Sequence, residues 1–328
     1  MLDTILGALL PMVVTFLLGY VAAWRHDFGS KDASTLNRMV LRYAVPLALF
    51  AGTVMTSRAA LGQDVPLIIT LCVAIIGFYC VVFLISRFIF RKQMSTSALA
   101  ALTASAPAVP FVGPAVLGDL LGRLSAIPIA AASLVINLTV VPITILLLSL
   151  DSTERGQQKN TPARGEQENS SSPRSNAAVF AGKIAETLKE PMVWAPILAF
   201  IVVLSGFRIP QLFVHSLSLL GHASGGVALF ACGIVLASGK IKVNRKVLLF
   251  VFLKNIMQPA LVLGGLRWIG YGNPVVSEAV LTTAIPTMPI VIMFALRYGI
   301  AQDEAASSVF LSIMGSLVTM GIFIALTH

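Results

Sequence analysis

Two pairs of closely spaced prolines lie in the middle of long apolar runs. Pro107 and Pro110 form the first pair, and Pro286 and Pro289 form the second. Inside a helix, a proline removes a backbone donor and its ring clashes with the preceding turn. Each pair therefore predicts a helix that breaks near its middle. Two ordinary proline kinks are the alternative, but the repetition at matched positions favours a shared functional purpose.

The segments around the second proline of each pair are the predicted sites of chemistry. The N-terminus of a half-helix carries partial positive charge and free N–H groups, and both attract anions. We therefore expect Phe111 to Gly113 and Ile290 to Ile292 to offer donors to a negatively charged group. Thr287 and other hydroxyl residues near the breaks could line the same site or satisfy carbonyls that the prolines free.

Three further polar residues lie inside apolar runs. Lys254 is the predicted partner of the anion, because a charge in such a run is costly and usually functional. The alternative is that its side chain extends to the interface. Gln258 follows one turn later, and Asn137 lies in an earlier run; each could bind a carboxylate or a neighbouring helix. The predicted substrate-binding residues are Pro107, Ala108, Pro110, Phe111, Val112, Gly113, Asn137, Lys254, Gln258, Pro286, Thr287, Met288, Pro289 and Ile290.

The composition indicates the environment of the elements that carry these residues. The chain has 328 residues, of which 57% are hydrophobic and 11% charged. Its mean hydropathy is +0.89. Apolar runs of roughly 20 residues recur, the length that a helix needs to cross a bilayer. The alternation typical of a membrane barrel is absent. The sequence therefore predicts an all-α membrane protein, with no motif for a metal or a cofactor.

We expect about ten spans, and the basic residues near their ends indicate the orientation. The predicted spans are 2–24, 33–55, 64–86, 96–118, 124–150, 191–207, 211–237, 246–269, 274–296 and 304–326. Lys and Arg are concentrated at one side, as in Arg87, Arg91 and Lys92. The positive-inside rule then predicts a cytoplasmic (inner or plasma) membrane protein with both termini outside. The net charge of +9 thus needs no nucleic-acid partner.

Internal similarity divides the chain into two halves. Pro11-Met12-Val13 recurs as Pro191-Met192-Val193, and Ala48-Leu49-Phe50-Ala51 recurs as Ala228-Leu229-Phe230-Ala231 at the same offset. Residues 1–150 and 191–328 are the predicted five-helix repeats. Residues 151–190 form a cytoplasmic linker, polar at first and ending in a predicted amphipathic helix.

Five spans per repeat is an odd number, so the second repeat must enter the membrane in the opposite orientation. Inverted repeats with broken helices are typical of secondary transporters. A membrane receptor that binds without transporting is the alternative. An intramembrane enzyme is disfavoured, because paired catalytic aspartates and zinc-protease motifs are missing. We therefore expect a transporter of a small organic anion and no enzymatic activity.

The motifs also resemble the auxin efflux carrier family, particularly its bacterial malonate-permease-like branch. The resemblance rests on Tyr43 to Phe50, Pro107 with Gly113, Lys254 with Pro259, and Arg297-Tyr298-Gly299. The order and spacing of these motifs together make the similarity specific.

This resemblance implies that spans four and nine cross at their breaks, as in sodium–proton antiporters and bile-acid symporters. It also implies an elevator-type mechanism, a carboxylate substrate and often a homodimer. Family members commonly carry Asn after the first crossover proline, where this chain has Ala108. The anion, which could be auxin, malonate, malate or lactate, and the direction of transport stay open.

Overall fold

The computed structural model describes residues 2–55, 64–159, 182, 189–207, 209–239 and 242–327. Regular structure in these ranges is helical, with one isolated β-bridge, so the all-helical prediction is confirmed. Most of the predicted linker, residues 160–181 and 183–188, lies outside the described residues. The amphipathic helix predicted there therefore remains an expectation.

The first part of the chain forms helices that coincide closely with the predicted spans. They are α1 (Leu2–Trp24), α2 (Ser30–Met39) with η1 (Val40–Ala44) and α3 (Val45–Val54), α5 (Val65–Cys72) with η2 (Val73–Gly77), α6 (Phe78–Leu84) and η3 (Ile85–Ile89), α7 (Met94–Ser105), α8 (Val109–Leu121), η4 (Gly122–Ser125), and α9 (Ala126–Val135) with η5 (Ile136–Val140) and α10 (Val141–Lys159).

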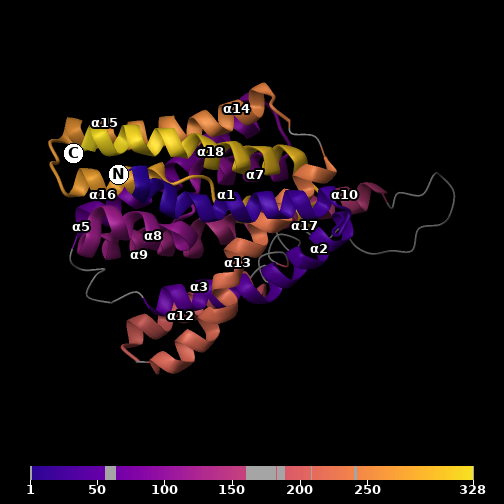
Figure 1. Ribbon diagram of the computed structural model, residues 1–328, viewed down its shortest axis with the longest axis horizontal. Helices are drawn as coiled ribbons and strands as arrows, with labels where there is room; N and C mark the ends of the chain where they lie inside the picture. The colour runs from indigo at the N-terminus through magenta and orange to yellow at the C-terminus, as the bar shows by residue number, and fades with distance from the viewer. Residues whose placement is uncertain are drawn as a thin grey trace.

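The second part also contains an interrupted helix before its last helix. Its elements are α12 (Pro191–Ser205), α13 (Gln211–Ser238), α14 (Arg245–Phe252) with η6 (Leu253–Met257) and α15 (Gln258–Ile269), α16 (Val275–Ala284), α17 (Ile290–Tyr298) and α18 (Gln302–Thr327). Figure 1 shows the start of α1 and the end of α18 at the same end of the bundle, while α10 extends at the opposite end.

Several of these helices can cross a bilayer on length and composition. Among the described residues, the stretches Val65–Ile89, Val109–Asp151, Gln211–Ser238, Arg245–Ile269 and Gln302–Thr327 meet that description. Shorter apolar helices cover Leu9–Trp24, Pro191–Ser205 and Val275–Ala284. The membrane class inferred from composition is therefore supported by the helices themselves.

Three long helices contain a wide, π-helical turn two residues before a proline. The turns η1, η5 and η6 precede Pro46, Pro142 and Pro259. Because a proline inside a helix lacks a donor and clashes with the preceding turn, a wider turn removes the conflict without ending the helix. Asn137 lies in η5 and Lys254 lies in η6. The distorted turns thus carry two of the polar residues that the sequence singled out.

Helices α1 and α13 pack with almost no space between their backbones. A Cβ atom added to Gly19 would lie 2.1 Å from the Phe230 carbonyl oxygen, and one added to Gly233 would lie 2.2 Å from the Phe16 carbonyl oxygen. Any side chain larger than hydrogen would force the helices apart. Such small-residue contacts are typical of helix pairs in membranes, where close van der Waals packing drives association.

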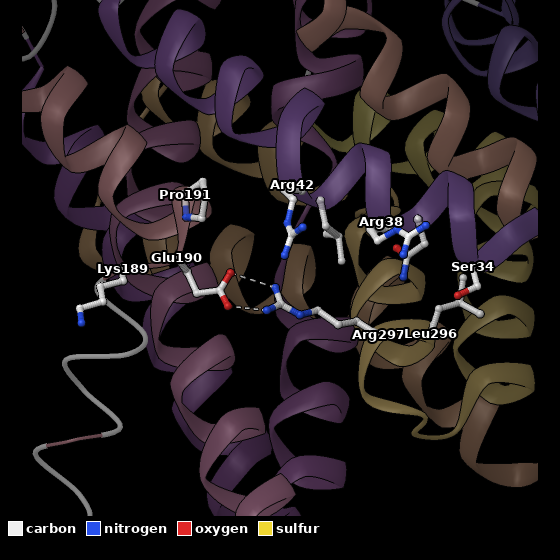
Figure 2. A pocket seen from close by; sticks show the side chains of 10 residues that line it. Ser34, Arg38, Arg42, Lys189, Glu190, Pro191, Leu296 and Arg297 are labelled. Carbon is white, nitrogen blue, oxygen red and sulfur yellow. Dashed lines mark hydrogen bonds and ion pairs between the residues drawn. The ribbon is translucent and has the colours of Figure 1, made fainter.

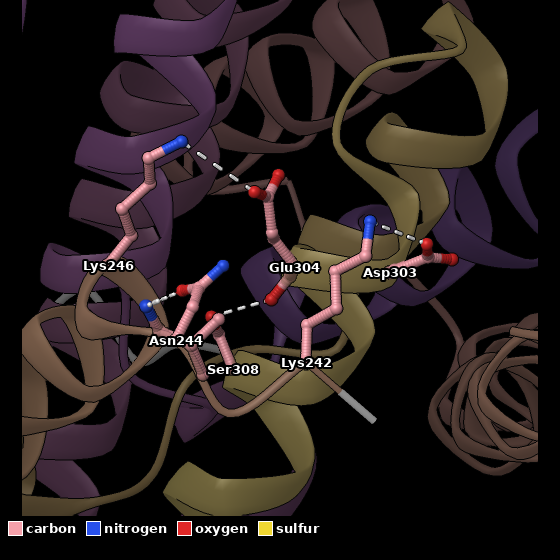
Figure 3. Close-up of polar contacts among 7 residues, drawn as sticks. Lys242, Asn244, Lys246, Asp303, Glu304 and Ser308 are labelled. Atoms are coloured by element: carbon pink, nitrogen blue, oxygen red, sulfur yellow. Dashed lines mark hydrogen bonds and ion pairs between the residues drawn. The ribbon is translucent and has the colours of Figure 1, made fainter. Parts of the chain in front are cut away.

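Ion pairs join the connection before α14, and the first turn of α14, to the first turn of α18 (Figure 3). The Lys242 ammonium lies 2.9 Å from an Asp303 carboxylate oxygen, and Lys246 lies 3.8 Å from Glu304. The hydrogen bond to Asp303 raises the pKa of Lys242, so this exposed side chain stays charged at neutral pH. The two acids also lie in the first turn of α18, where negative charge is favoured by the helix dipole.

Candidate functional site

The two helix interruptions lie against each other and share backbone hydrogen bonds. The Ala108 N–H donates to the Pro286 carbonyl at 2.9 Å, and the Met288 N–H donates to the Ala106 carbonyl at 3.0 Å. Pro107 and Thr287 form an antiparallel bridge between these bonds. All six residues are buried. Since unpaired backbone groups are costly in lipid, each interruption satisfies polar groups that the other exposes.

Side chains complete the pairing on the Thr287 side. The Thr287 hydroxyl donates to the Thr103 carbonyl at 3.0 Å, and the Thr287 N–H donates to Ser312 Oγ at 3.0 Å. Ser312 in turn donates to Asn255 Oδ1 at 2.7 Å, and Asn255 Nδ2 donates to the Ser312 carbonyl at 2.7 Å. The sequence left open whether the Thr287 hydroxyl lines the site or satisfies a carbonyl that a proline frees. In the structure it donates to the Thr103 carbonyl, which Pro107 leaves without its helical donor.

Lys254 and Gln258 bind the carbonyl ends of the interrupted helices. The Lys254 ammonium donates to the Thr283 carbonyl at 2.6 Å and to Gln258 Oε1 at 2.9 Å. Gln258 Nε2 donates to the Ser105 carbonyl at 2.9 Å and to the Ala74 carbonyl at 3.3 Å. Thr283 lies in the last turn of α16 and Ser105 ends α7, where the helix dipole is negative and a cation is favoured.

The Lys254 side chain is fully buried, and no carboxylate among the described residues forms an ion pair with it. The alternative considered from sequence, in which the Lys254 side chain extends to the membrane interface, does not fit this burial. The Thr283 carbonyl and the Gln258 amide oxygen contact the ammonium in place of a counter-ion. Lys254 therefore stabilises the end of α16 directly, and it contacts the end of α7 only through Gln258.

A cavity of about 670 Å³ adjoins the first turn of α8. Its wall is contributed by α1, α3, α8, α9, η5 and α13, and it reaches Pro289 at the start of α17. Most of the wall is apolar. The polar side chains in it are Thr15, Ser133, Asn137 and Ser218. The volume lies within the range of about 300–1,000 Å³ that is common for small-molecule sites.

Asn137 is the most informative polar residue in this wall. It is 2% exposed, and its Oδ1 has no hydrogen-bond partner among the described residues. A buried amide group without a partner is unusual and calls for an explanation such as a ligand. Because an amide can rotate to present oxygen or nitrogen, Asn137 can accept or donate toward a solute.

The predicted rows of free N–H groups are largely taken up inside the helix starts. The Phe111 and Val112 N–H groups both donate to the Ala108 carbonyl at 3.0 Å. In α17 the Val291 N–H donates to Met288 and the Ile292 N–H donates to Pro289. The bonds of Phe111, Val291 and Ile292 span three residues, so tight first turns use donors that an ideal α-helix leaves free. The Val112 bond spans four residues and is the ordinary bond of an α-helix. The dipole of each half-helix remains, but few backbone N–H groups at its start are free to bind a ligand.

The structure separates the residues predicted from sequence into three groups. Pro110, Phe111, Val112, Asn137 and Pro289 lie in the cavity wall. Pro107, Ala108, Pro286, Thr287 and Met288 form the paired interruptions. Lys254, Gln258, Gly113 and Ile290 are buried outside the cavity wall.

Sequence reasoning did not identify Ser133, Gly221 or Gly225 as wall residues. A Cβ atom on Gly221 would lie 2.8 Å from Ala48 Cα, and one on Gly225 would lie 2.7 Å from the Phe111 ring. The signal available was the run of small residues in α13, which permits close helix approach. Among the described residues, no cluster of His, Cys, Asp and Glu has the geometry of a metal site.

Comparisons with known proteins identify the family of the chain. The chain is 31% identical over 327 residues to the uncharacterized transporter YfdV of Escherichia coli K12, covering 99% of this chain and 98% of that protein. It is 22% identical over 318 residues to the putative malonate transporter of Rhizobium meliloti, covering 96% and 93%. The family described as membrane transport protein matches residues 4–324. The chain therefore belongs to this auxin efflux carrier-like family of membrane transport proteins.

Proposed function

We propose that this protein carries small carboxylates across the cytoplasmic membrane and binds them in the cavity beside α8. The observation that carries the proposal is the unpartnered amide oxygen of Asn137 in the wall of a cavity that begins at a half-helix N-terminus. A partial positive charge at the start of α8 favours the carboxylate group. The apolar remainder of the wall suits a short carbon skeleton.

Malonate is the first candidate substrate. The relative from Rhizobium meliloti is named a putative malonate transporter and matches nearly the whole chain. Auxin, malate and lactate share the carboxylate chemistry and belong in the same panel. Asn137 and Ser133 are the side chains proposed to hold the polar atoms of the solute, while Lys254 stabilises the interrupted helices and does not touch it.

The proposed architecture consists of two inverted five-helix repeats, residues 1–150 and 191–328, whose interrupted helices cross at the paired breaks. The tight contact between α1 and α13 suits a fixed scaffold. The interrupted helices and their neighbours would move against it as an elevator, with the cavity at the boundary. A homodimer held by the scaffold would follow from the family resemblance.

Counterflow in proteoliposomes tests the proposal. Liposomes loaded with unlabelled malonate should accumulate labelled malonate from outside when they contain the wild-type protein. Asn137→Ala should raise the half-saturating malonate concentration about tenfold, the loss expected for one hydrogen bond to a charged group. Thr139→Ala is the matched control, because Thr139 lies in the same π-helical turn but outside the cavity wall.

The two functional alternatives give different results in this assay. A receptor would bind malonate, with Asn137→Ala weakening the binding, but would show no counterflow. A transporter of an unrelated solute would show neither binding nor counterflow with any carboxylate in the panel. Equal half-saturation for the Asn137 and Thr139 variants would rule out the cavity as the binding site.

A further inference from the structure

A second cavity, of about 560 Å³, lies at the far end of α17 from Pro289. Figure 2 shows its side chains coming from the helix that contains α2 and η1, from the start of α12 and from the end of α17. We call it the basic pocket. Its lining residues are Ser34, Asn37, Arg38, Leu41, Arg42, Lys189, Glu190, Pro191, Leu296 and Arg297.

The basic pocket contains more positive than negative charge. Arg297 forms an ion pair with Glu190, in which one guanidinium nitrogen lies 3.2 Å from Oε2 and the other contacts Oε1. Among the described residues, no acid forms an ion pair with Arg38 or Arg42. In Figure 2 the Arg42 side chain points toward the Glu190–Arg297 pair. Gathered cations that a single carboxylate does not neutralise favour an anionic ligand.

Asn37 supplies a second, independent sign of a ligand. The residue lines the pocket and is 4% exposed, yet its Oδ1 has no partner among the described residues. Its Nδ2 donates to the Met293 carbonyl of α17 at 3.1 Å, which fixes the orientation of the amide. The free acceptor would suit a solute that carries a proton donor beside its ionised carboxylate, such as a hydroxyl group or the protonated second carboxyl of the hydrogen malonate ion.

The basic pocket and the cavity beside α8 share the same two elements. Pro289 begins α17 in the first cavity, and Leu296 and Arg297 end it in the basic pocket. Seven residues of helix correspond to about 10 Å. The helix from Ser30 to Val54 likewise lines the basic pocket with its first turns and the cavity with its last ones. The two cavities therefore lie along one boundary between these elements.

We infer that the basic pocket is a second binding site for a small carboxylate, placed at the cytoplasmic end of the transport path. The ligand contacts Arg42 and competes with Glu190 for the Arg297 guanidinium. Binding there frees the start of α12 from the end of α17. The identity of the ligand as the transported anion rests on the proposed function, whereas the site itself rests on the charges and on Asn37.

Equilibrium binding of labelled malonate to the full chain in nanodiscs of neutral phosphatidylcholine tests this inference. Wild-type protein should bind malonate in two phases. Arg42→Gln should weaken one phase at least tenfold, and Glu190→Gln should strengthen the same phase, because it removes the competing carboxylate. Arg38→Gln provides a second variant if Arg42→Gln does not fold. Arg123→Gln, with the same loss of charge in η4, should leave both phases unchanged.

The variants distinguish failure of the inference from failure of the proposed function. If the cavity beside α8 does not bind carboxylates, Asn137→Ala will have no effect while the phase sensitive to Arg42 remains. If the basic pocket is not an anion site, Arg42→Gln and Glu190→Gln will bind malonate as the wild type does. Phosphatidylglycerol added to the nanodiscs tests for a lipid occupant. If it displaces malonate from the phase sensitive to Arg42 at a lower concentration than unlabelled malonate does, the occupant is a lipid headgroup and the inference is wrong.

Discussion

Replacing Lys254 with methionine should destabilise the protein without weakening anion binding. The substitution keeps a long, flexible side chain but removes both donors. The Thr283 carbonyl and Gln258 Oε1 would then be buried without those hydrogen bonds. Each buried acceptor left unsatisfied costs about 1–3 kcal/mol. Relief from burying an ammonium group offsets part of that loss, so we expect a net loss of about 2–3 kcal/mol in the free energy of unfolding.

A loss of this size should lower the melting temperature by about 3–4 °C for a chain of 328 residues. Melting of the purified protein in detergent, followed by intrinsic fluorescence, measures the change. Lys31→Met is the matched control, because it removes an exposed ammonium and should leave the melting temperature unchanged. The half-saturating malonate concentration of Lys254→Met should stay within twofold of wild type. A variant that melts like wild type but no longer binds malonate would refute this reasoning and restore Lys254 as an anion ligand.

Three further substitutions test other parts of the structure. Gly233→Leu should prevent α1 from packing against α13, seen as loss of the monodisperse peak in size-exclusion chromatography, whereas Gly264→Leu, with open space around its Cβ position, should keep that peak. Gln258→Leu should lower the melting temperature by several degrees, because the Ser105 carbonyl loses its side-chain donor; an unchanged value would show that water replaces the amide. Gly225→Ala should reduce the counterflow rate severalfold by pressing on the Phe111 ring, and a rate equal to wild type would show that the ring yields freely.

Much of the helical arrangement could be predicted because its signals are local. Apolar runs of the length of a bilayer gave the spans, and Pro107 and Pro286 gave the two interruptions. Asn137 could be identified as a candidate because an amide in an apolar run is rare. Each of these inferences uses a residue and its near neighbours in sequence, without knowledge of what packs against them.

The partners of the same residues could not be predicted from local signals. Lys254 was expected to face an anion, but its ammonium donates to Thr283, which lies on another helix. The amides of Phe111 and Val112 were expected to be free, but both donate to the Ala108 carbonyl. No local pattern singled out Arg42, because its place in a cavity depends on α12 and α17 folding beside it. Long-range packing decides all of these outcomes.

The hydrogen bonds between the two interruptions also bear on how the molecule can change shape. Separating α7 and α8 from α16 and α17 would leave the Ala108 and Met288 N–H groups without hydrogen-bond acceptors in an apolar environment, at a cost of several kcal/mol per group. These four half-helices are thus tied into one rigid body at their centre. A large movement that carries a solute to the opposite side must therefore take place at the outer surfaces of this four-helix unit and leave the paired interruptions intact.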